Sequence, residues 1–247
     1  VEFHFADFLI TGITAVINQI MKIRYMTGGQ AKLPIILRGP DGVAKSAGAQ
    51  HSQSIETVFM HIPGIEVIVP STPYDMKGLF KTALKKDDPV VCFEHKALYR
   101  VKGPVPEEEY YIPFGEADVK REGSDITVVA TARMVHECLK AAENLSNEGI
   151  DVEVIDLRTL VPWDKEAIIN SVKKTSHLVV AHETWRRCGW GAEIAATVQE
   201  EVFDYLDAPI GRVGAKNVPM PFSPPLESFV VPNHEDVEKA IRKTLSK

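Results

Sequence analysis

The fold is decided by residues 65–93, IEVIVPSTPYDMKGLFKTALKKDDPVVCF. The apolar run Ile65–Val69 has the length and the β-branched content of a buried strand. A helix is predicted from Pro73 to about Lys86, and Val90–Phe93 is a second apolar strand. This order predicts a βαβ unit with two parallel strands.

The start of the predicted helix is strongly marked. Thr72 can cap the helix with its hydroxyl, Pro73 occupies the first helical position, and Asp75 brings negative charge to the N-terminus. The run Asp87-Asp88-Pro89 then breaks the helix before the second strand. Local signals alone therefore fix both ends of this helix.

The same alternation continues on both sides of this stretch. Before it, apolar residues at helical spacing predict a helix over residues 10–23 that stops at Gly28-Gly29. After it, strands and helices alternate to the end of the chain. The remaining predicted strands are Leu33–Leu37, Ile126–Ala130, Val152–Asp156, Leu178–His182 and Ile210–Val213, and the remaining predicted helices are Ser54–His61, Val135–Asn147, Asp164–Lys174, Gly191–Leu206 and about Glu235–Leu245.

A change in composition divides the chain. Between Lys96 and Pro113 the sequence is rich in proline, glycine and glutamate and cannot build a core, which is typical of a linker. We therefore expect an α/β fold of two domains, each with a mostly parallel sheet flanked by helices. The predicted boundaries are 1–100 for the first domain, 101–115 for the linker and 116–247 for the second domain.

Composition excludes several classes of function. The net charge of −6 and the absence of a basic stripe argue against a nucleic-acid-binding protein. The apolar runs are strand-sized, which argues against a membrane span, and no signal peptide is visible. The 3 cysteines have no disulfide or metal spacing, so we expect small buried residues in a reducing compartment.

The candidate catalytic residue is His51, in the run Gln50-His51-Ser52-Gln53-Ser54. This run follows a glycine-containing loop and comes at the end of a strand-to-helix connection, where parallel α/β sheets bind ligands. Histidine suits proton transfer near neutral pH. A purely structural histidine is the alternative interpretation. The sequence contains no dinucleotide-binding, P-loop, α/β-hydrolase or zinc-protease motif that would offer another site.

Five stretches, in this order, carry a resemblance to a known family. They are Gln50–Ser54, Pro73–Leu79, Asp87–Val91, Val154–Leu160 and Gly191–Glu193. With them, the chain resembles, from Glu2 to the C-terminus, the beta subunit of the thiamine-diphosphate-dependent decarboxylating component of 2-oxo acid dehydrogenase complexes. This group includes the pyruvate, branched-chain and acetoin types and belongs to the transketolase superfamily.

The resemblance implies a pyrimidine-binding domain followed by a transketolase C-terminal-like domain. It also implies an active site shared with an alpha subunit, which holds Mg²⁺ and the diphosphate of the cofactor, in a heterotetramer of two alpha and two beta chains. The implied reaction is oxidative decarboxylation of a 2-oxo acid, with transfer of the acyl group to a lipoyl group. The implied compartment is the cytoplasm of a prokaryote or the mitochondrial matrix of a eukaryote.

The resemblance also assigns residues. His51 matches the active-site histidine that assists acyl transfer, and Phe8 matches the aromatic residue that packs on the aminopyrimidine ring of the cofactor. His4 lies near the substrate pocket by this match, or is a surface histidine. An ordinary core role is the alternative for Phe8.

Two further matches concern a cation and a partner. The end of the helix near residue 83, together with Ile35, resembles a loop whose carbonyl groups bind a potassium ion, and simple polar capping of the helix is the alternative. The residues implied are Ile35, Ala83, Leu84, Lys86 and Asp88. Asp207 matches the acidic position that binds the subunit-binding domain of the dihydrolipoamide acyltransferase core, although an exposed Asp before a turn needs no such role.

One departure from the family keeps other interpretations open. Relatives have a further N-terminal portion with a glutamate that activates the cofactor, and no glutamate of this sequence matches it. A non-catalytic assembly module of the same complex is therefore one alternative. Another transketolase-superfamily enzyme, such as a transketolase or a deoxyxylulose phosphate synthase, is the second.

Overall fold

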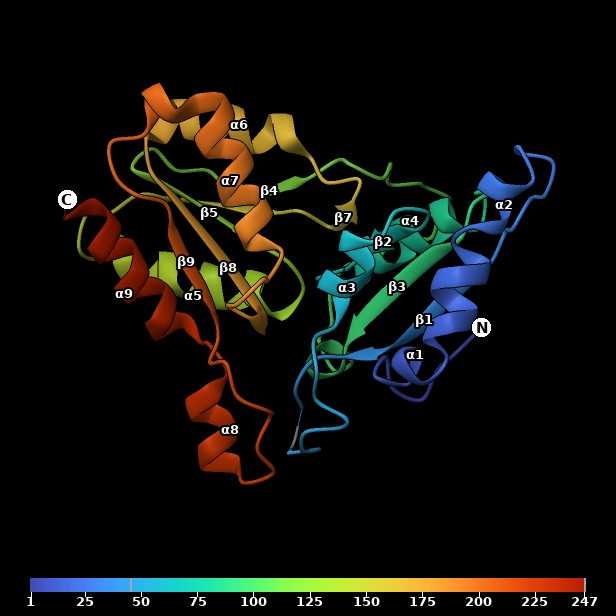
Figure 1. The fold of residues 1–247 in the computed structure, drawn as a ribbon. Coiled ribbons are helices and arrows are strands. Elements are labelled where there is room, and N and C mark those ends of the chain that lie inside the picture. Colours follow the sequence, from blue (N-terminus) through green and yellow to red (C-terminus); the bar gives the residue numbers. More distant parts are fainter. Residues whose placement is uncertain (45, 247) are drawn as a thin grey trace.

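A computed structural model describes residues 1–44 and 46–246 and shows two β-sheets, each covered by helices (Figure 1). The first sheet has the strand order β1-β3-β2-β7 and the second the order β4-β6-β5-β8-β9. The predicted fold of two α/β domains with mostly parallel sheets is confirmed.

The predicted βαβ unit forms, although its helix ends at Ala83 and not at the predicted Lys86. Strands β2 (Glu66–Ile68) and β3 (Val90–His95) are parallel neighbours, with Glu66 opposite Val90. Helix α4 (Pro73–Ala83) connects them, and the Thr72 hydroxyl caps it by accepting a hydrogen bond from the Asp75 amide at 3.1 Å. The cap holds the helix N-terminus at the carboxyl end of β2.

The first strand of this sheet, β1 (Ile36–Asp41), begins later than the predicted Leu33 and runs through Gly39 and Pro40. It pairs in parallel with β3, and the N-terminal segment borders its other edge through an isolated bridge from Glu2 to Arg38. A proline is tolerated there because it cannot donate to a ladder and is confined to such edge positions.

The predicted helix over residues 10–23 is wrong as a single element. The chain forms α1 (Phe8–Thr11), the π-helical segment η1 (Thr14–Ile20) and α2 (Ile23–Met26). Gly12 lies at the first break, where its conformational freedom weakens a helix. The predicted stop is confirmed, because Gly28 and Gly29 have φ of 61° and 83°.

The second sheet carries helices on both faces. Strands β5 (Ile126–Ala130), β6 (Val152–Asp156), β8 (Leu178–Trp185) and β9 (Gly211–Ala215) are parallel, and the edge strand β4 (Asp118–Arg121) is antiparallel to β6. Helices α5 (Arg133–Ser146) and α9 (His234–Leu245) cover one face, and α6 (Lys165–Thr175) and α7 (Gly191–Val202) the other (Figure 1).

Along each buried strand of the second sheet, successive side chains point to opposite faces and so pack with different pairs of helices. Val128 and Val179 pack with α5 and α9, while their neighbours Val129 and Val180 pack with α6 and α7. The second layer is continuous with the core of the first domain, including Phe59. The two domains therefore share one apolar core.

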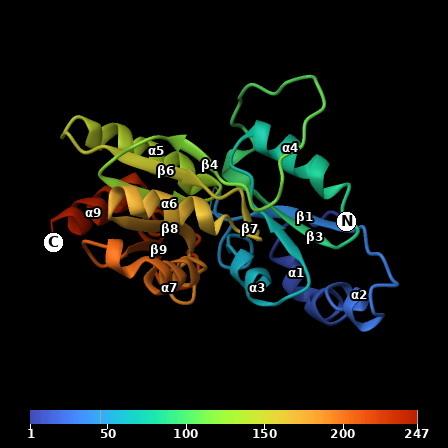
Figure 2. The same ribbon diagram turned by 90° about the horizontal axis from the view of Figure 1, so that it is seen from above.

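A strand from the second half of the chain completes the first sheet. Strand β7 (Thr159–Val161) follows β6 and pairs antiparallel with β2, at the junction of the two domains (Figure 2). Strands β4 and β7 and the short helix α8 (Pro224–Val230) are absent from the sequence-based prediction. The shorter helix α3 (Glu56–His61) follows the predicted catalytic loop.

Candidate active site

His51 lies in the irregular connection between β1 and α3, beside two aromatic rings. Its imidazole stacks on Phe5, with ring centroids 4.6 Å apart and an interplanar angle of 20°. The ring of Phe8 meets the imidazole edge-on at 5.6 Å. Phe8 is 41% exposed. The structure thus brings together the two residues predicted for catalysis and cofactor binding.

The imidazole itself has one buried and one available nitrogen. Within the described residues, Nδ1 of His51 is buried and has no hydrogen-bond partner. Nε2 is the other nitrogen that can exchange a proton with a bound molecule. The backbone carbonyl of His51 accepts a hydrogen bond from Nζ of Lys96 at 2.6 Å.

The rest of the loop is held by side chains from both domains. The amide nitrogen of the Gln53 side chain donates to Oδ1 of Asp7 at 2.8 Å. The hydroxyl of Thr184, on β8, donates to the carbonyl of Ser54 at 2.9 Å. Because Thr184 belongs to the second domain, the position of the loop depends on how the two domains pack.

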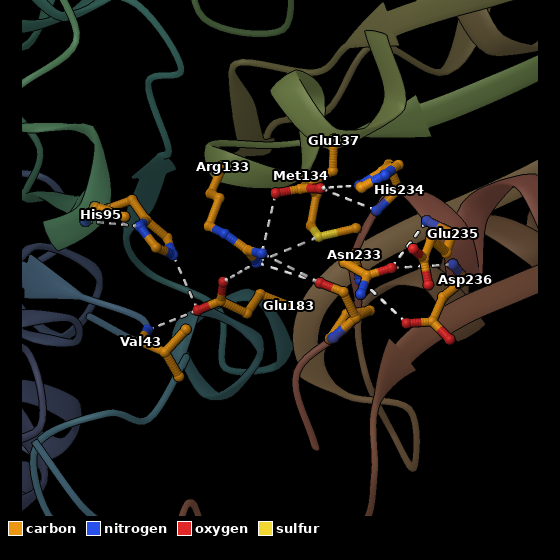
Figure 3. Close-up of polar contacts among 12 residues, drawn as sticks. Val43, His95, Arg133, Met134, Glu137, Glu183, Asn233, His234, Glu235 and Asp236 are labelled. Carbon is orange, nitrogen blue, oxygen red and sulfur yellow. Dashed lines mark hydrogen bonds and ion pairs between the residues drawn. The ribbon is translucent and has the colours of Figure 1, made fainter. Parts of the chain in front are cut away.

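Below the loop, a buried carboxylate joins the two domains (Figure 3). Oε1 of Glu183, on β8, lies 2.9 Å from Nε2 of His95 and accepts from the amide of Val43 at 2.7 Å. Its Oε2 accepts from Arg133 of the second domain at 2.8 Å. Burial alone would raise the pKa of Glu183, but the charges of His95 and Arg133 outweigh it and the pKa falls to about 2.

This cluster fills the position where an open parallel sheet usually binds a ligand. Connections run in opposite directions from β5 and β8, so the crevice at their carboxyl ends is a topological switch point. Here the crevice is closed by residues of the first domain, and the cavity that remains has a volume of about 10 Å³. That is about the size of one water molecule. The second domain supports the His51 loop through Thr184, and a cavity of about 1260 Å³, lined in part by Ser54, Thr184 and Trp190, lies beside the filled crevice.

Two further buried carboxyls, Asp41 and Glu56, line the same small cavity. Burial and the proximity of the other carboxyl raise the pKa of Asp41 well above its usual range. Burial raises the pKa of Glu56 to about 7, although Nε1 of Trp190 donates to its Oε1 at 3.3 Å. Both carboxyl groups therefore bind a proton more tightly in the folded protein than in water.

Sequence reasoning missed this group of buried ionisable residues. Asp41, Glu56, His95, Arg133 and Glu183 come from five separate segments of the chain. The available signal was a charged residue inside an otherwise apolar segment, as with Glu183 at the end of an apolar strand. That signal does not identify partners that are distant in sequence.

Of the other predicted site residues, His4 lies near the residues around His51 and Asp207 does not. His4 is exposed and is a sequence neighbour of Phe5. Asp207 is exposed on the turn before β9, at the amino end of the second sheet, while the residues around His51 meet its carboxyl end. The structure therefore does not bring Asp207 to the candidate active site.

The residues predicted to bind potassium gather where α4 ends. The carbonyl of Ile35 accepts from the amide of Val90 at 2.9 Å, and that of Ala83 accepts from the amide of Lys86 at 3.2 Å. Leu84 is exposed. The side chain of Asp88 forms an ion pair with Arg24 at 2.8 Å. The carbonyl of Ile35 lies at the amino ends of β1 and β3, whereas the loop that carries His51 follows the carboxyl end of β1.

Three observations bear on other kinds of site. In residues 1–44 and 46–246, no group of three or more His, Cys, Asp or Glu side chains is placed to hold a metal ion. Among the helices of that same part of the chain, none is long and apolar enough to cross a membrane. Cys92 and Cys138 are buried as expected, but Cys188 is exposed, which corrects the expectation for that residue.

Comparison with known proteins identifies both domains. Residues 1–102 match the family model of the transketolase pyrimidine binding domain, and residues 115–237 match that of the transketolase C-terminal domain. Among solved structures, a split gene transketolase described as an inactive beta4 tetramer superimposes with a TM-score of 0.80 and 26% sequence identity. This match covers 98% of the chain and 74% of that structure.

Sequence relatives are beta subunits of several dehydrogenases. The chain is 46% identical to the pyruvate dehydrogenase E1 component subunit beta of Rickettsia felis, over 98% of the chain and 74% of the relative. It is 47% identical to the acetoin:2,6-dichlorophenolindophenol oxidoreductase subunit beta of Bacillus subtilis, over 96% of the chain and 69% of the relative. It is 43% identical to the 2-oxoisovalerate dehydrogenase subunit beta of Bacillus subtilis, over 98% of the chain and 75% of the relative.

Proposed function

The chain belongs to the family of E1 beta subunits of 2-oxo acid dehydrogenase complexes, and from this premise we propose how its own residues serve the reaction. We propose that it acts with an alpha subunit on a 2-oxo acid or acetoin. For a 2-oxo acid, the carboxyl group leaves as CO₂ and the acyl group is transferred to a lipoyl disulfide. That disulfide is thereby reduced to one thioester and one thiol.

The observation that carries this proposal is the pairing of His51 with the open ring of Phe8. A half-exposed aromatic face suits stacking of a planar pyrimidine, so the residues present fit thiamine diphosphate. When bound, the cofactor supplies the carbon nucleophile and the electron sink for decarboxylation. In this proposal the alpha subunit holds the diphosphate and Mg²⁺.

The role we propose for His51 is proton transfer and hydrogen bonding at Nε2. Its Nδ1 is buried against the protein, so Nε2 is the atom that reaches the acyl group and the lipoyl sulfur. His4, exposed beside Phe5, is proposed to border the pocket for the acyl group. The assignment of His51 rests on its position in the loop and on the family match, and that of His4 on its place next to Phe5 and on the family match.

Two further proposals concern the assembled complex. The exposed Asp207 would form an ion pair with the subunit-binding domain of the acyltransferase core, and a heterotetramer of two alpha and two beta chains is the proposed assembly. The carbonyl groups near the end of α4, together with that of Ile35, would bind potassium. We place the complex in the cytoplasm of a bacterium or in the mitochondrial matrix of a eukaryote.

The solved relative suggests a second candidate state. That protein is described as an inactive tetramer of beta chains. We propose that this chain also self-associates without catalysis when the alpha subunit is absent. In this state it would behave as the assembly module considered above.

One experiment tests the catalytic proposal. The chain is purified alone and with its alpha subunit, and each sample is assayed with thiamine diphosphate, Mg²⁺, an artificial electron acceptor, and pyruvate, branched-chain 2-oxo acids or acetoin. We expect turnover of at least one substrate in the mixed sample and none in the chain alone. A mixed complex that forms but turns over none of the substrates would reject the catalytic proposal and leave the assembly module.

A further inference from the structure

The loop that carries His51 has few regular backbone hydrogen bonds. In the described part of the chain, the amide of His51 donates to the carbonyl of Gly48 at 3.3 Å, and the amide of Gly42 donates to the carbonyl of Gln53 at 2.9 Å. Side chains from neighbouring elements supply most of the remaining contacts. The orientation of the imidazole therefore depends on those side chains.

Lys96 is one of these side chains, and it makes two contacts close to the imidazole of His51. It is the first residue of the short helix η2 (Lys96–Leu98), directly after β3. Its Nζ donates to the carbonyl of His51 at 2.6 Å and lies 5.0 Å from the ring centroid of Phe5. Phe5 is the ring on which the imidazole stacks. A single ammonium group thus contacts both the backbone of His51 and the ring that supports its side chain.

Lys96 lies among negatively charged groups. Four carboxyl groups face it, those of Asp7 before α1, Asp41 on β1, Glu183 on β8 and Glu227 on α8. Within the described residues Lys96 forms no ion pair with any of them. Its one directed hydrogen bond goes to the carbonyl of His51. Burial lowers the pKa of Lys96, and the surrounding carboxyl groups oppose that shift.

We propose that Lys96 is a positioning residue for His51, fixing the His51 carbonyl and the Phe5 ring so that Nε2 of the imidazole faces the bound acyl group. The inference rests on the proposed role of His51. Lys96 does not touch the reacting atoms in this arrangement. It acts by preventing rotation of the peptide and of the ring stack, because small displacements of a catalytic group lower the rate strongly.

Kinetics of the complex with the alpha subunit test the inference. Lys96→Met keeps the length of the side chain and removes the charge and the donors. We expect it to lower kcat for lipoamide acylation about tenfold to a hundredfold, with KM for the 2-oxo acid within about twofold of the wild type. Lys96→Arg keeps a charged donor and is expected to restore most of kcat. Lys102→Met, at an exposed lysine of the linker, is the matched control.

A second measurement does not depend on activity. Histidine labelled with ¹³C at Cε1 gives a resonance for His51, assigned by its loss in His51→Gln, and stacking on Phe5 shifts this resonance. Lys96→Met is expected to move it toward the position of an unstacked histidine, and Lys102→Met to leave it unchanged. Phe5→Leu removes the stacked ring itself and should give the same resonance shift and the same loss of kcat, which provides a second variant if Lys96→Met folds poorly.

The outcomes separate the two proposals. If Lys96→Met and Phe5→Leu both leave the resonance and kcat unchanged, or if Lys96→Arg is as impaired as Lys96→Met, the positioning role is overturned. If the resonance moves while His51→Ala and Lys96→Met are both fully active, positioning is supported and the catalytic role of His51 fails. A moved resonance together with a lower kcat supports both.

Discussion

At the scale of single residues, Gly42 shows how closely the two domains approach. Its φ of 73° is unusual for any residue with a side chain. A Cβ at this position would lie 2.3 Å from Nε2 of His95 and 2.6 Å from Oε1 of Glu183. Only glycine therefore allows the backbone to pass this buried ion pair.

We predict that Gly42→Ala destabilises the protein by about 2 kcal/mol or more, since it combines backbone strain with a clash in the ion pair. The matched control is Gly149→Ala, because Gly149 also has a positive φ but open space around it. In Gly149→Ala only backbone strain destabilises the protein, and the expected loss in free energy of unfolding is about 1 kcal/mol. Urea unfolding of both variants measures the difference, and equal losses would show that the predicted clash is absent.

The family resemblance assigned separate roles to His51 and Phe8, and these roles stay predictions. The structure adds that the two rings lie 5.6 Å apart. Residue-level prediction from the sequence failed for Glu183 and Glu56 because each is buried by a partner far away in the chain, such as Val43 for Glu183. No local pattern contains that information.

At the scale of elements, helix α4 is tied to the second domain through its first turn. Asp75 was predicted only as a charge at the helix N-terminus. In the structure its Oδ1 accepts from Arg158 at 2.7 Å, and its Oδ2 accepts from Lys120 at 3.1 Å. Burial raises the pKa of Asp75, but its partners Thr72, Lys120 and Arg158 outweigh burial, and the net shift is downward.

We predict that Asp75→Asn lowers the free energy of unfolding by about 2 kcal/mol, because a neutral amide weakens two charge-assisted hydrogen bonds, while Arg158 and Lys120 keep Asp118 as a partner. Hydrogen exchange should increase first at the amides of α4 and β4, the two elements that this ion pair joins. Asp87→Asn serves as control, since Asp87 pairs with Lys32 at the exposed surface. Protection of α4 that is unchanged in Asp75→Asn would contradict the account.

Elements with strong local signals were predictable, and those that depend on tertiary contacts were not. The β2–α4–β3 unit has a cap, a proline and a breaker in the right places. Strand β7 has only the three residues Thr159–Val161 and forms because β2 offers it an edge. The helix over residues 10–23 has the right apolar spacing, but many of its apolar residues remain partly exposed, including Ile10 at 40%.

At the scale of the whole molecule, buried ionisable groups at the domain junction couple stability to pH. Glu56 has a pKa of about 7 in the folded protein and an ordinary value near 4.5 when unfolded. A raised pKa means that the folded state binds the proton more tightly. The stability that Glu56 contributes is therefore complete below pH 4.5 and is lost as the pH rises through 7.

We predict that the wild type loses about 2 kcal/mol of stability from this group between about pH 5 and pH 8. Glu56→Gln cannot ionise at this position. Its free energy of unfolding should therefore fall less than that of the wild type between about pH 5 and pH 8. Glu143→Gln, on the exposed side of α5, is the control. Denaturant unfolding at both pH values checks this, and parallel pH dependences for wild type and Glu56→Gln would refute it.

The arrangement of the domains was the least predictable feature. Two α/β domains could be inferred from the alternation of strands and helices, but nothing local indicates that the first domain fills the crevice of the second. That packing depends on Val43 and His95 meeting Glu183 across the junction. It places the exposed ring of Phe8 beside the imidazole of His51, at the site that we propose to be shared with an alpha subunit.

We propose that His51 transfers protons in a reaction shared with the alpha subunit, and the activity of a His51 variant in the assembled complex tests this role. In the complex with that subunit, lipoamide acylation is measured for His51→Ala and for His61→Ala, an exposed histidine at the end of α3. We predict a loss in kcat on the order of a hundredfold for His51→Ala, the usual contribution of a general acid or base, and no loss for His61→Ala. Full acylation by a correctly assembled His51→Ala complex would contradict the account.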